Sequence, residues 1–245
     1  MKRILWIALL LAPSAAARAD SVDLGDLRLA LIDDPVRIEF QAGVTAPGLD
    51  KMRQTIAIVA GTKDWKVAAE TEGRTELMRL VRGTHMVKVA VTYDQSGCRI
   101  RYLQSDNLLY KELQQSGAGL RAIHKNYNGW VRQLAAALAG GFGVPTRTAF
   151  GFAPLERADA VPFLGEGGRA AYKEFLSAPA PRAFALAPNG AFGWYAPVKP
   201  PSYYATRNII DPVASAMERC NRRGDGACRL YAVDERVVWS EPEAR

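Results

Sequence analysis

The chain has 245 residues and a formal net charge of +7; 49% of its residues are hydrophobic and 23% are charged. This much apolar sequence can bury a core, so a disordered protein is excluded. The charges are dispersed, without a block of five or six like charges, and the sequence carries no nucleic-acid-binding motif. We therefore expect no nucleic-acid partner.

The first 19 residues have the organisation of a secretory signal peptide. Lys2 and Arg3 precede nine apolar residues, 4–12, and an Ala-Arg-Ala tripeptide at 17–19 marks a cleavage point. This succession of charged, apolar and small residues is typical of a cleaved export signal. The alternative is a membrane anchor, but a spanning helix needs about 20 apolar residues. We therefore expect export and no transmembrane span.

Cleavage before Asp20 changes the charge of the working protein. Loss of Lys2, Arg3 and Arg18 from the 32 basic residues leaves 29 against 25 acidic ones, a net charge of +4. A mild positive charge favours an anionic neighbour. We expect a periplasmic or secreted protein of the Gram-negative bacterial type. The sequence does not identify its partner; an envelope protein and an anionic cell-envelope component are the two candidates.

Residues 20–139 predict an antiparallel sheet. Five short segments are predicted strands: 36–40, 65–69, 75–81, 87–93 and 99–103. In 87–93 valines alternate with other residues, a period of two that is typical of a strand with one buried face. Glycines at 73 and 97 lie between consecutive segments, where hairpin turns are needed.

Two helices are predicted beside this sheet. Apolar residues recur at intervals of three and four from Leu49 to Val59, which puts them on one face of a helix over 47–60. A second helix over 123–139 has its apolar residues within one arc of a helical wheel. Because such a stripe must be buried, most simply against the sheet, the fold class is predicted to be α+β.

Residues 140–165 contain five Gly and three Pro, which predicts a linker between two lobes. Residues 166–245 predict a second, smaller α+β lobe. An Asn-Gly pair at 189–190 supplies a hairpin turn, and Asp211 before Pro212 is a good helix start. The predicted elements are a helix over 168–177, strands over 182–187 and 191–195, a helix from 211, and strands over 229–233 and 237–239.

The chain has three cysteines, Cys98, Cys220 and Cys228. An exported protein meets an oxidising compartment, which permits disulfides. Seven residues that include two glycines separate Cys220 from Cys228, so the chain can turn back and we predict a disulfide between them. Cys98 is then left over. It is either a small buried hydrophobe or a reactive thiol, which would need a nearby base or positive charge.

The sequence offers no convergent reactive residues, so we predict no catalytic residue, no metal and no cofactor. It has no nucleophile elbow or phosphate-binding loop, and the Gly-rich residues 140–143 follow a helix instead of a strand. His85 and His124 lie 39 positions apart, which gives a zinc site little support. Asp33 and Asp34 are adjacent, so on an extended chain they point to opposite sides and make a weak acid/base pair.

The candidate ligand-binding site lies around the second helix. His124 and Asn128 are four residues apart, so they share one face of the predicted helix. Ser105 and Asn107 follow the last predicted strand and are expected to lie nearby, where the four side chains could bind a small polar ligand. The alternative is structural: His124 caps or packs, and Asn107 orders a turn.

Two functions stay open at this point. The first is an exported envelope protein that works as a non-catalytic binding or structural module. The second is a periplasmic hydrolase or thiol enzyme with a site around His124, between the lobes. This enzyme would bring His124, Asn128 and either Cys98 or Ser105 within hydrogen-bond reach.

Two segments resemble a known family. Residues 100–110 have the pattern Y-x-x-S-x-N-L-x-Y, and residues 123–131 have the pattern I-H-x-x-Y-N-x-W-V. Together they are similar to a family of small exported proteobacterial proteins and lipoproteins, over roughly residues 49–138. The resemblance implies an α+β fold and an envelope location, and nothing catalytic. This chain departs from the family in lacking a lipoprotein cysteine and in a longer stretch between the patterns. The tail, with CRLYAVD at 228–234, resembles a segment of unassigned role that is appended to various bacterial proteins.

Overall fold

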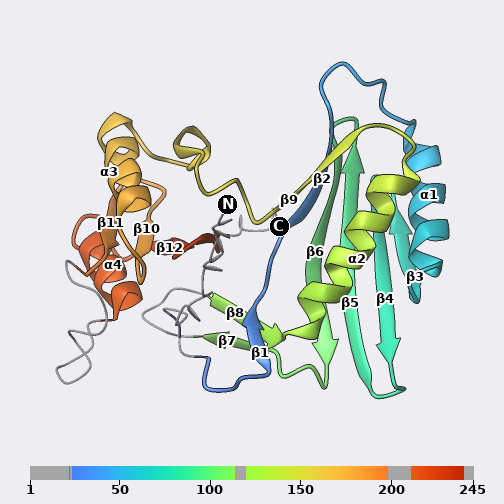
Figure 1. Cartoon of the computed structure of the whole chain (residues 1–245), viewed down its shortest axis with the longest axis horizontal. Helices are drawn as coiled ribbons and strands as arrows, with labels where there is room; N and C mark the ends of the chain where they lie inside the picture. Colours follow the sequence, from blue (N-terminus) through green and yellow to red (C-terminus); the bar gives the residue numbers. More distant parts are fainter. Residues whose placement is uncertain (1–21, 23, 114–119, 198–210, 240–245) are drawn as a thin grey trace, which may run out of the picture.

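The computed structural model describes residues 22, 24–113, 120–197 and 211–239 (Figure 1). Within these ranges the chain is α+β, as predicted, with antiparallel sheets of six, four and three strands. No helix in the described ranges is long and apolar enough to cross a bilayer. The predicted signal peptide, residues 1–19, lies outside the described residues.

The largest sheet has the strand order β3-β4-β5-β6-β2-β9. Its strands are β2 (Val36–Phe40), β3 (Trp65–Thr71), β4 (Arg74–Val81), β5 (His85–Asp94), β6 (Gly97–Asp106) and β9 (Thr146–Phe150). Successive hairpins join β3 to β6, and Gly73 and Gly97 occupy positive φ at their turns, a conformation that glycine adopts without strain. β9 lies inside the predicted linker 140–165, but it pairs with β2 and so belongs to the first lobe.

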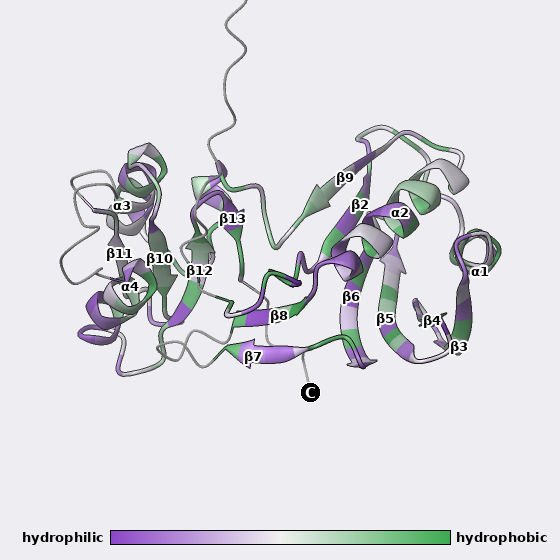
Figure 2. Cartoon of the chain, turned by 60° about the horizontal axis from the view of Figure 1, so that its bottom comes forward, coloured by the Kyte–Doolittle hydropathy of each residue, from purple (hydrophilic) through white to green (hydrophobic). Residues whose placement is uncertain are grey.

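Helices α1 (Leu49–Gly61) and α2 (Asn126–Gly141) cover one face of this sheet (Figure 1). Ile56 of α1 and Leu134 of α2 are fully buried against alternate strand residues such as Val89. Since successive strand side chains point to opposite faces, the residues between these apolar ones lie on the other face. That face carries charged side chains on β2 and β6, seen as hydrophilic segments in Figure 2.

The second helix begins later than predicted. Residues 123 and 124 belong to β8 (Leu120–His124), and α2 begins at Asn126. β8 is the central strand of the three-stranded sheet, between β1 (Leu29–Leu31) and β7 (Lys111–Leu113). Pairing on both sides outweighs the local helical spacing, because tertiary contacts override intrinsic propensity. His124 and Asn128 therefore do not share a helical face, and that part of the prediction is wrong.

The smaller lobe is a four-stranded sheet between two helices. The strand order is β11-β10-β12-β13, from β10 (Ala183–Leu186), β11 (Phe192–Tyr195), β12 (Arg229–Val233) and β13 (Arg236–Val237). Phe184 of β10 faces the aromatic residues of α3 (Glu166–Ser177), and Ala185 faces α4 (Pro212–Asn221). The two helices therefore cover opposite faces. A short 3-10 helix, η2 (Ala158–Ala160), precedes this lobe.

Two predicted features of the smaller lobe are confirmed. Asp211 caps α4: its Oδ1 accepts hydrogen bonds from the backbone N–H groups of Val213 and Ala214. Cys220 and Cys228 form a disulfide with a Cα–Cα distance of 6.0 Å, which joins the end of α4 to the start of β12. A lobe of this size has a small core, so the disulfide adds stability that burial alone supplies poorly.

The two lobes share an apolar contact. Leu31, Leu113 and Leu120 of the three-stranded sheet belong to the same cluster as Val213 and Ala185 of the smaller lobe. On the other side of the junction, Gly151 lies so close to the backbone of Val237 that a Cβ at Gly151 would meet its carbonyl oxygen at 2.9 Å. The smaller lobe thus packs against the three-stranded sheet β1-β8-β7.

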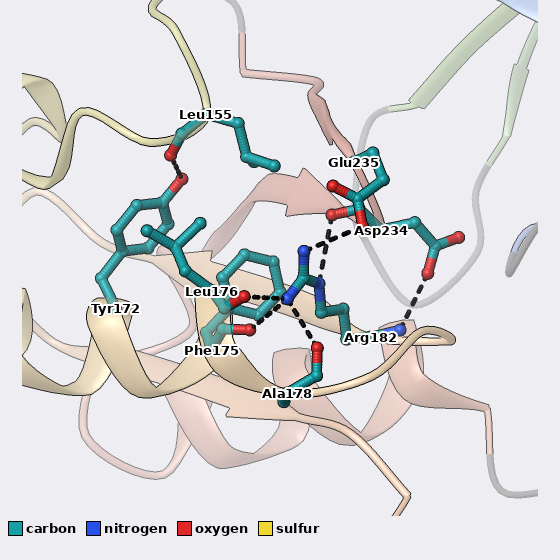
Figure 3. Close-up of polar contacts among 8 residues, drawn as sticks. All are labelled: Leu155, Tyr172, Phe175, Leu176, Ala178, Arg182, Asp234 and Glu235. Carbon is teal, nitrogen blue, oxygen red and sulfur yellow. Dashed lines mark hydrogen bonds and ion pairs between the residues drawn. The ribbon is translucent and has the colours of Figure 1, made fainter. Parts of the chain in front are cut away.

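A buried arginine holds the smaller lobe together (Figure 3). The guanidinium Nη1 of Arg182 donates to three backbone carbonyls at the end of α3, between residues 175 and 178. Its backbone N–H donates to Oδ1 of Asp234 at 2.9 Å, and Nη2 lies 3.0 Å from Oε1 of Glu235. A cation near the C-terminal carbonyls of a helix is stabilising, so this side chain ties α3 to the β12–β13 turn.

Candidate ligand-binding site

The predicted site residue Asn128 is engaged in the fold. Its Nδ2 donates to the carbonyl oxygen of Leu31 at 2.8 Å, and its Oδ1 accepts from the backbone N–H of Asp33 at 3.2 Å. Both ends of the amide therefore bind the connection between β1 and β2, and the side chain is buried. A buried amide satisfied at both ends orders the backbone that it binds.

The other three predicted residues also have local partners. The hydroxyl of Ser105 lies 2.9 Å from that of Tyr102. Asn107 Nδ2 donates to the carbonyl of Thr84 at 2.7 Å. His124 Nδ1 accepts a 3.3 Å hydrogen bond from the backbone of residue 126. The backbone N–H of His124 donates to the carbonyl of Leu108, so His124 lies near the end of β6 that carries Ser105, but each side chain serves its own turn or strand end.

Cys98 has the environment of an inert thiol. It is 4% exposed, and burial raises its pKa to about 12, with the charge of Asp94 acting in the same direction. His124 lies beyond the opposite end of β6, and at about 3.3 Å per residue the strand spans on the order of 25 Å. Cys98 and His124 therefore do not converge. A thiol enzyme needs a nucleophilic thiol next to a general base, and these two residues do not supply that arrangement.

The adjacent carboxylates Asp33 and Asp34 are also structural. Asp34 is buried and forms an ion pair with Arg121 at 2.7 Å, while Asp33 pairs with Arg132. Burial raises the pKa of Asp34, and the charge of Arg121 opposes this. The two acids point to different partners, as expected of neighbours on an extended segment.

A hollow of about 420 Å³ opens on the polar face of the six-stranded sheet. Arg37 and Glu39 of β2, Arg99 of β6, and Thr92 and Asp94 of β5 supply its polar lining. We call it the arginine hollow. The apolar residues between these positions face the helices, so the alternation of each strand turns the charged side chains outward.

A glycine lets β6 come close to β2 beside the arginine hollow. A Cβ at Gly97 would lie 2.0 Å from the carbonyl oxygen of Ile38, a contact that no side chain tolerates. The close pairing sets Arg37 directly opposite Arg99 in the β2–β6 register. Like charges directly opposite each other across two strands are destabilising unless something neutralises them.

One carboxylate neutralises part of this charge. Oε1 of Glu39 lies 2.6 Å from Nη1 of Arg37, and Oε2 lies 2.6 Å from Nη2 of Arg147. Burial by itself would raise the pKa of Glu39, but the hydrogen bond from Arg147 and the charges of both arginines outweigh it and lower the pKa. Glu39 is therefore a firmly ionised bridge between two cations.

Positive charge and donors remain after this bridge is made. Nε of Arg37 donates to the carbonyl of Gly151, whereas its Nη2 is buried and has no partner among the described residues. Arg99 is exposed on the floor of the hollow and also has no hydrogen-bond partner in the described ranges. Arginine remains charged in proteins, so the three arginines exceed the charges of Glu39 and Asp94 by one.

Asp94 gives the arginine hollow an acidic corner. Its Oδ1 accepts from the N–H of Ser96 at 2.7 Å and from the hydroxyl of the same residue. The side-chain hydrogen bond from Ser96 is the main reason that the pKa of Asp94 is lowered. The lining of the hollow thus combines two arginines, Arg37 and Arg99, with the ionised carboxylate of Asp94, whose pKa the charge of Arg99 also lowers.

This arrangement is suited to binding an anionic group. Guanidinium groups bind carboxylates and phosphates through paired, charge-assisted hydrogen bonds. The only thiol on the lining, Cys98, is buried and its pKa is raised to about 12, so the lining supplies charge and hydrogen bonds without a reactive thiol. In the described part of the chain, no three His, Cys, Asp or Glu side chains are grouped to hold a metal ion.

The sequence did carry a signal for this site. V-R-I-E-F at 36–40 and C-R-I-R-Y at 98–102 both alternate apolar and charged residues. The pairing of β2 with β6 joins strands about 60 residues apart, and local spacing does not reveal it. Comparison with protein-family models, curated proteins and solved structures finds no match to this chain.

Proposed function

We propose that this chain is an exported, non-catalytic binding protein that holds a small ligand by an anionic group in the arginine hollow. The observation that carries this proposal is the pair Arg37 and Arg99, which the β2–β6 register sets opposite each other on the arginine hollow, where the charges of the arginines exceed those of the carboxylates. Like charges directly opposite each other destabilise a pair of strands. A bound carboxylate or phosphate would relieve the repulsion between the two cations.

The size of the hollow supports a small ligand. About 420 Å³ is within the range of pockets that bind metabolite-sized molecules. Asp94 in the same lining favours a ligand that also carries a positive or hydrogen-bond-donating group. An envelope location is part of the proposal: the charged, apolar and small residues at the N-terminus and the Cys220–Cys228 disulfide both support it.

The test is thermal unfolding of the chain from Asp20 onward with phosphate, acetate or citrate at constant ionic strength. A ligand present at about 100 times its Kd stabilises the folded state by about 2.7 kcal/mol. We expect at least one of these anions to raise the melting temperature, and Arg99→Gln to abolish the shift. Arg28→Gln is the matched control, because Arg28 is exposed and pairs with Asp26 outside the hollow.

Equal shifts in the wild type and in Arg99→Gln would contradict the proposal, because the anion would then act elsewhere. A shift lost equally in Arg28→Gln would show that overall charge, and not the hollow, is responsible. The enzyme alternative makes a different prediction, since turnover of an ester or cell-wall substrate would have to fall on His124→Ala.

A further inference from the structure

β11 is an edge strand of the smaller sheet. In the strand order β11-β10-β12-β13 it lies at one end and, among the described residues, pairs only with β10. Figure 2 shows β11 on the side of the smaller lobe that is far from the six-stranded sheet. An edge strand presents backbone donors and acceptors that another strand can pair with.

The outward groups of this edge belong to Phe192 and Trp194. Residues in an antiparallel pair alternate between those that hydrogen-bond to the partner strand and those that do not. Ala187 N–H donates to the carbonyl of Ala191 at 2.8 Å, so the backbone N–H and C=O groups of residues 191, 193 and 195 point toward β10. The backbone groups of Phe192 and Trp194 therefore point away from β10. Arg219 agrees with this assignment, since its Nη1 donates to the outward carbonyl of Trp194 at 2.9 Å.

A basic groove of about 230 Å³ runs beside this edge, lined by Phe192, Gly193, Trp194, Arg219, Arg222 and Arg223. Helix α4 approaches so closely because β11 has a glycine here: a Cβ at Gly193 would lie 2.4 Å from the backbone nitrogen of Cys220. The close packing brings the three arginines at the end of α4 next to the outward backbone groups of β11.

The three arginines differ in how firmly they are held. Arg219 lies over the ring of Tyr195 at 4.9 Å and is fixed by its bond to β11. Arg222 pairs with Glu218 at 3.2 Å on the surface of α4, a contact that contributes little because water screens it. Arg223 is exposed. The groove therefore carries net positive charge after Glu218 is counted.

We propose that this groove binds an extended acidic peptide segment, which adds to the sheet as a strand beside β11. The N–H and C=O of Phe192 and the N–H of Trp194 would pair with the peptide backbone, while Arg219 keeps the Trp194 carbonyl. Acidic side chains on one face of the peptide would meet Arg222 and Arg223. Main-chain pairing gives such complexes affinity, and side-chain contacts give specificity. This site is separate from the arginine hollow.

The experiment uses the chain from Asp20 onward and a fluorescein-labelled ten-residue peptide of alternating Glu and Val. Binding is followed by fluorescence anisotropy at constant ionic strength. We expect the Kd to rise about two- to fivefold in Arg223→Gln and about tenfold in Arg222→Gln/Arg223→Gln. Arg169→Gln, an exposed arginine on α3, should bind like the wild type, and so should Arg99→Gln in the arginine hollow.

A change in the peptide tests strand addition without altering the protein. The same peptide with four consecutive N-methylated residues keeps its charges but loses its backbone donors, and we expect its affinity to fall at least tenfold. Equal binding of the two peptides would overturn strand addition, since charge alone would then explain the complex. Absence of binding to the unmodified peptide, or equal affinity in the double variant, would overturn the site itself.

Discussion

Replacing Arg182 with methionine tests how the smaller lobe is held together. The Arg182 side chain is 5% exposed, and it donates to the end of α3, to the carbonyl of Asp234 and to Glu235. Its guanidinium also lies 4.9 Å from the ring centre of Phe175. Methionine has a long apolar side chain, so Arg182→Met preserves much of the packing and removes the donors and the charge.

The expected loss follows from the groups left without a partner. Each buried acceptor that loses its hydrogen bond costs about 1–3 kcal/mol, and Nη1 of Arg182 serves three carbonyls. Rearrangement and water reduce the sum, and Glu235 is 51% exposed, so its charge is hydrated once Arg182 is gone; we expect a loss of about 2–3 kcal/mol. The free energy of unfolding is measured by urea titration with tryptophan fluorescence, which Trp194 and Trp239 report from the same lobe.

Arg157→Met is the matched control. Arg157 pairs with Asp159 at 2.6 Å, but its side chain is 57% exposed, so this substitution should not measurably move the urea midpoint. If Arg182→Met unfolds at the same midpoint as Arg157→Met, the buried guanidinium does not hold α3 to the sheet and the reasoning fails. Arg182→Lys should lie between the wild type and Arg182→Met, because one ammonium cannot reach all the acceptors.

Three further predictions concern stability and reactivity. Cys220→Ala/Cys228→Ala should lose about 2.5 kcal/mol of unfolding free energy for the loss of a short loop closure, and an unchanged urea midpoint would contradict this. Glu39 has a lowered pKa in the folded chain, so its ionised form stabilises the fold at pH values above the unfolded pKa. This contribution is lost as the pH falls through the folded pKa. When unfolding free energy is measured between about pH 5 and 3, Glu39→Gln should therefore lose less stability than the wild type. Cys98, with its pKa raised to about 12 by burial, should react with a disulfide reagent only in urea, and rapid labelling of the native chain would refute its burial.

Five strands of the first sheet and two of its three hairpin turns were predictable because they depend on local patterns. Alternation in 87–93 and the glycines at 73 and 97 act within a few residues of the chain. The same holds for the Asp211 cap and for the Cys220–Cys228 disulfide, whose partners are close in sequence. In each case the residues that determine the structure lie within one short segment of the chain.

Errors arose where distant pairing decides the structure. Ile123 and His124 fit the spacing of the following helix, yet β1 and β7 bind them on both sides as a strand. The Gly- and Pro-rich residues 140–165 contain β9, whose partner β2 lies more than 100 residues away. Local composition carries no information on such partners.

The site was missed for the same reason. The helical spacing of His124 and Asn128 predicted a site there, whereas the fold uses Asn128 to hold the backbone of residues 31 and 33. Arg37 and Arg99 look like ordinary surface residues of two strands. They become a candidate site only when β2 pairs with β6 and places one guanidinium opposite the other.

Side-chain NMR of the arginines tests the binding proposal most directly. The Nε–Hε signals of the chain from Asp20 onward would be assigned by substitution and followed during titrations with phosphate, acetate and citrate at constant ionic strength. We expect saturable shifts at Arg37, Arg99 and Arg147, and an unchanged signal at Arg157. Shifts that are absent, or that grow in parallel at Arg157 and in the hollow without saturation, would contradict an anion site on this sheet.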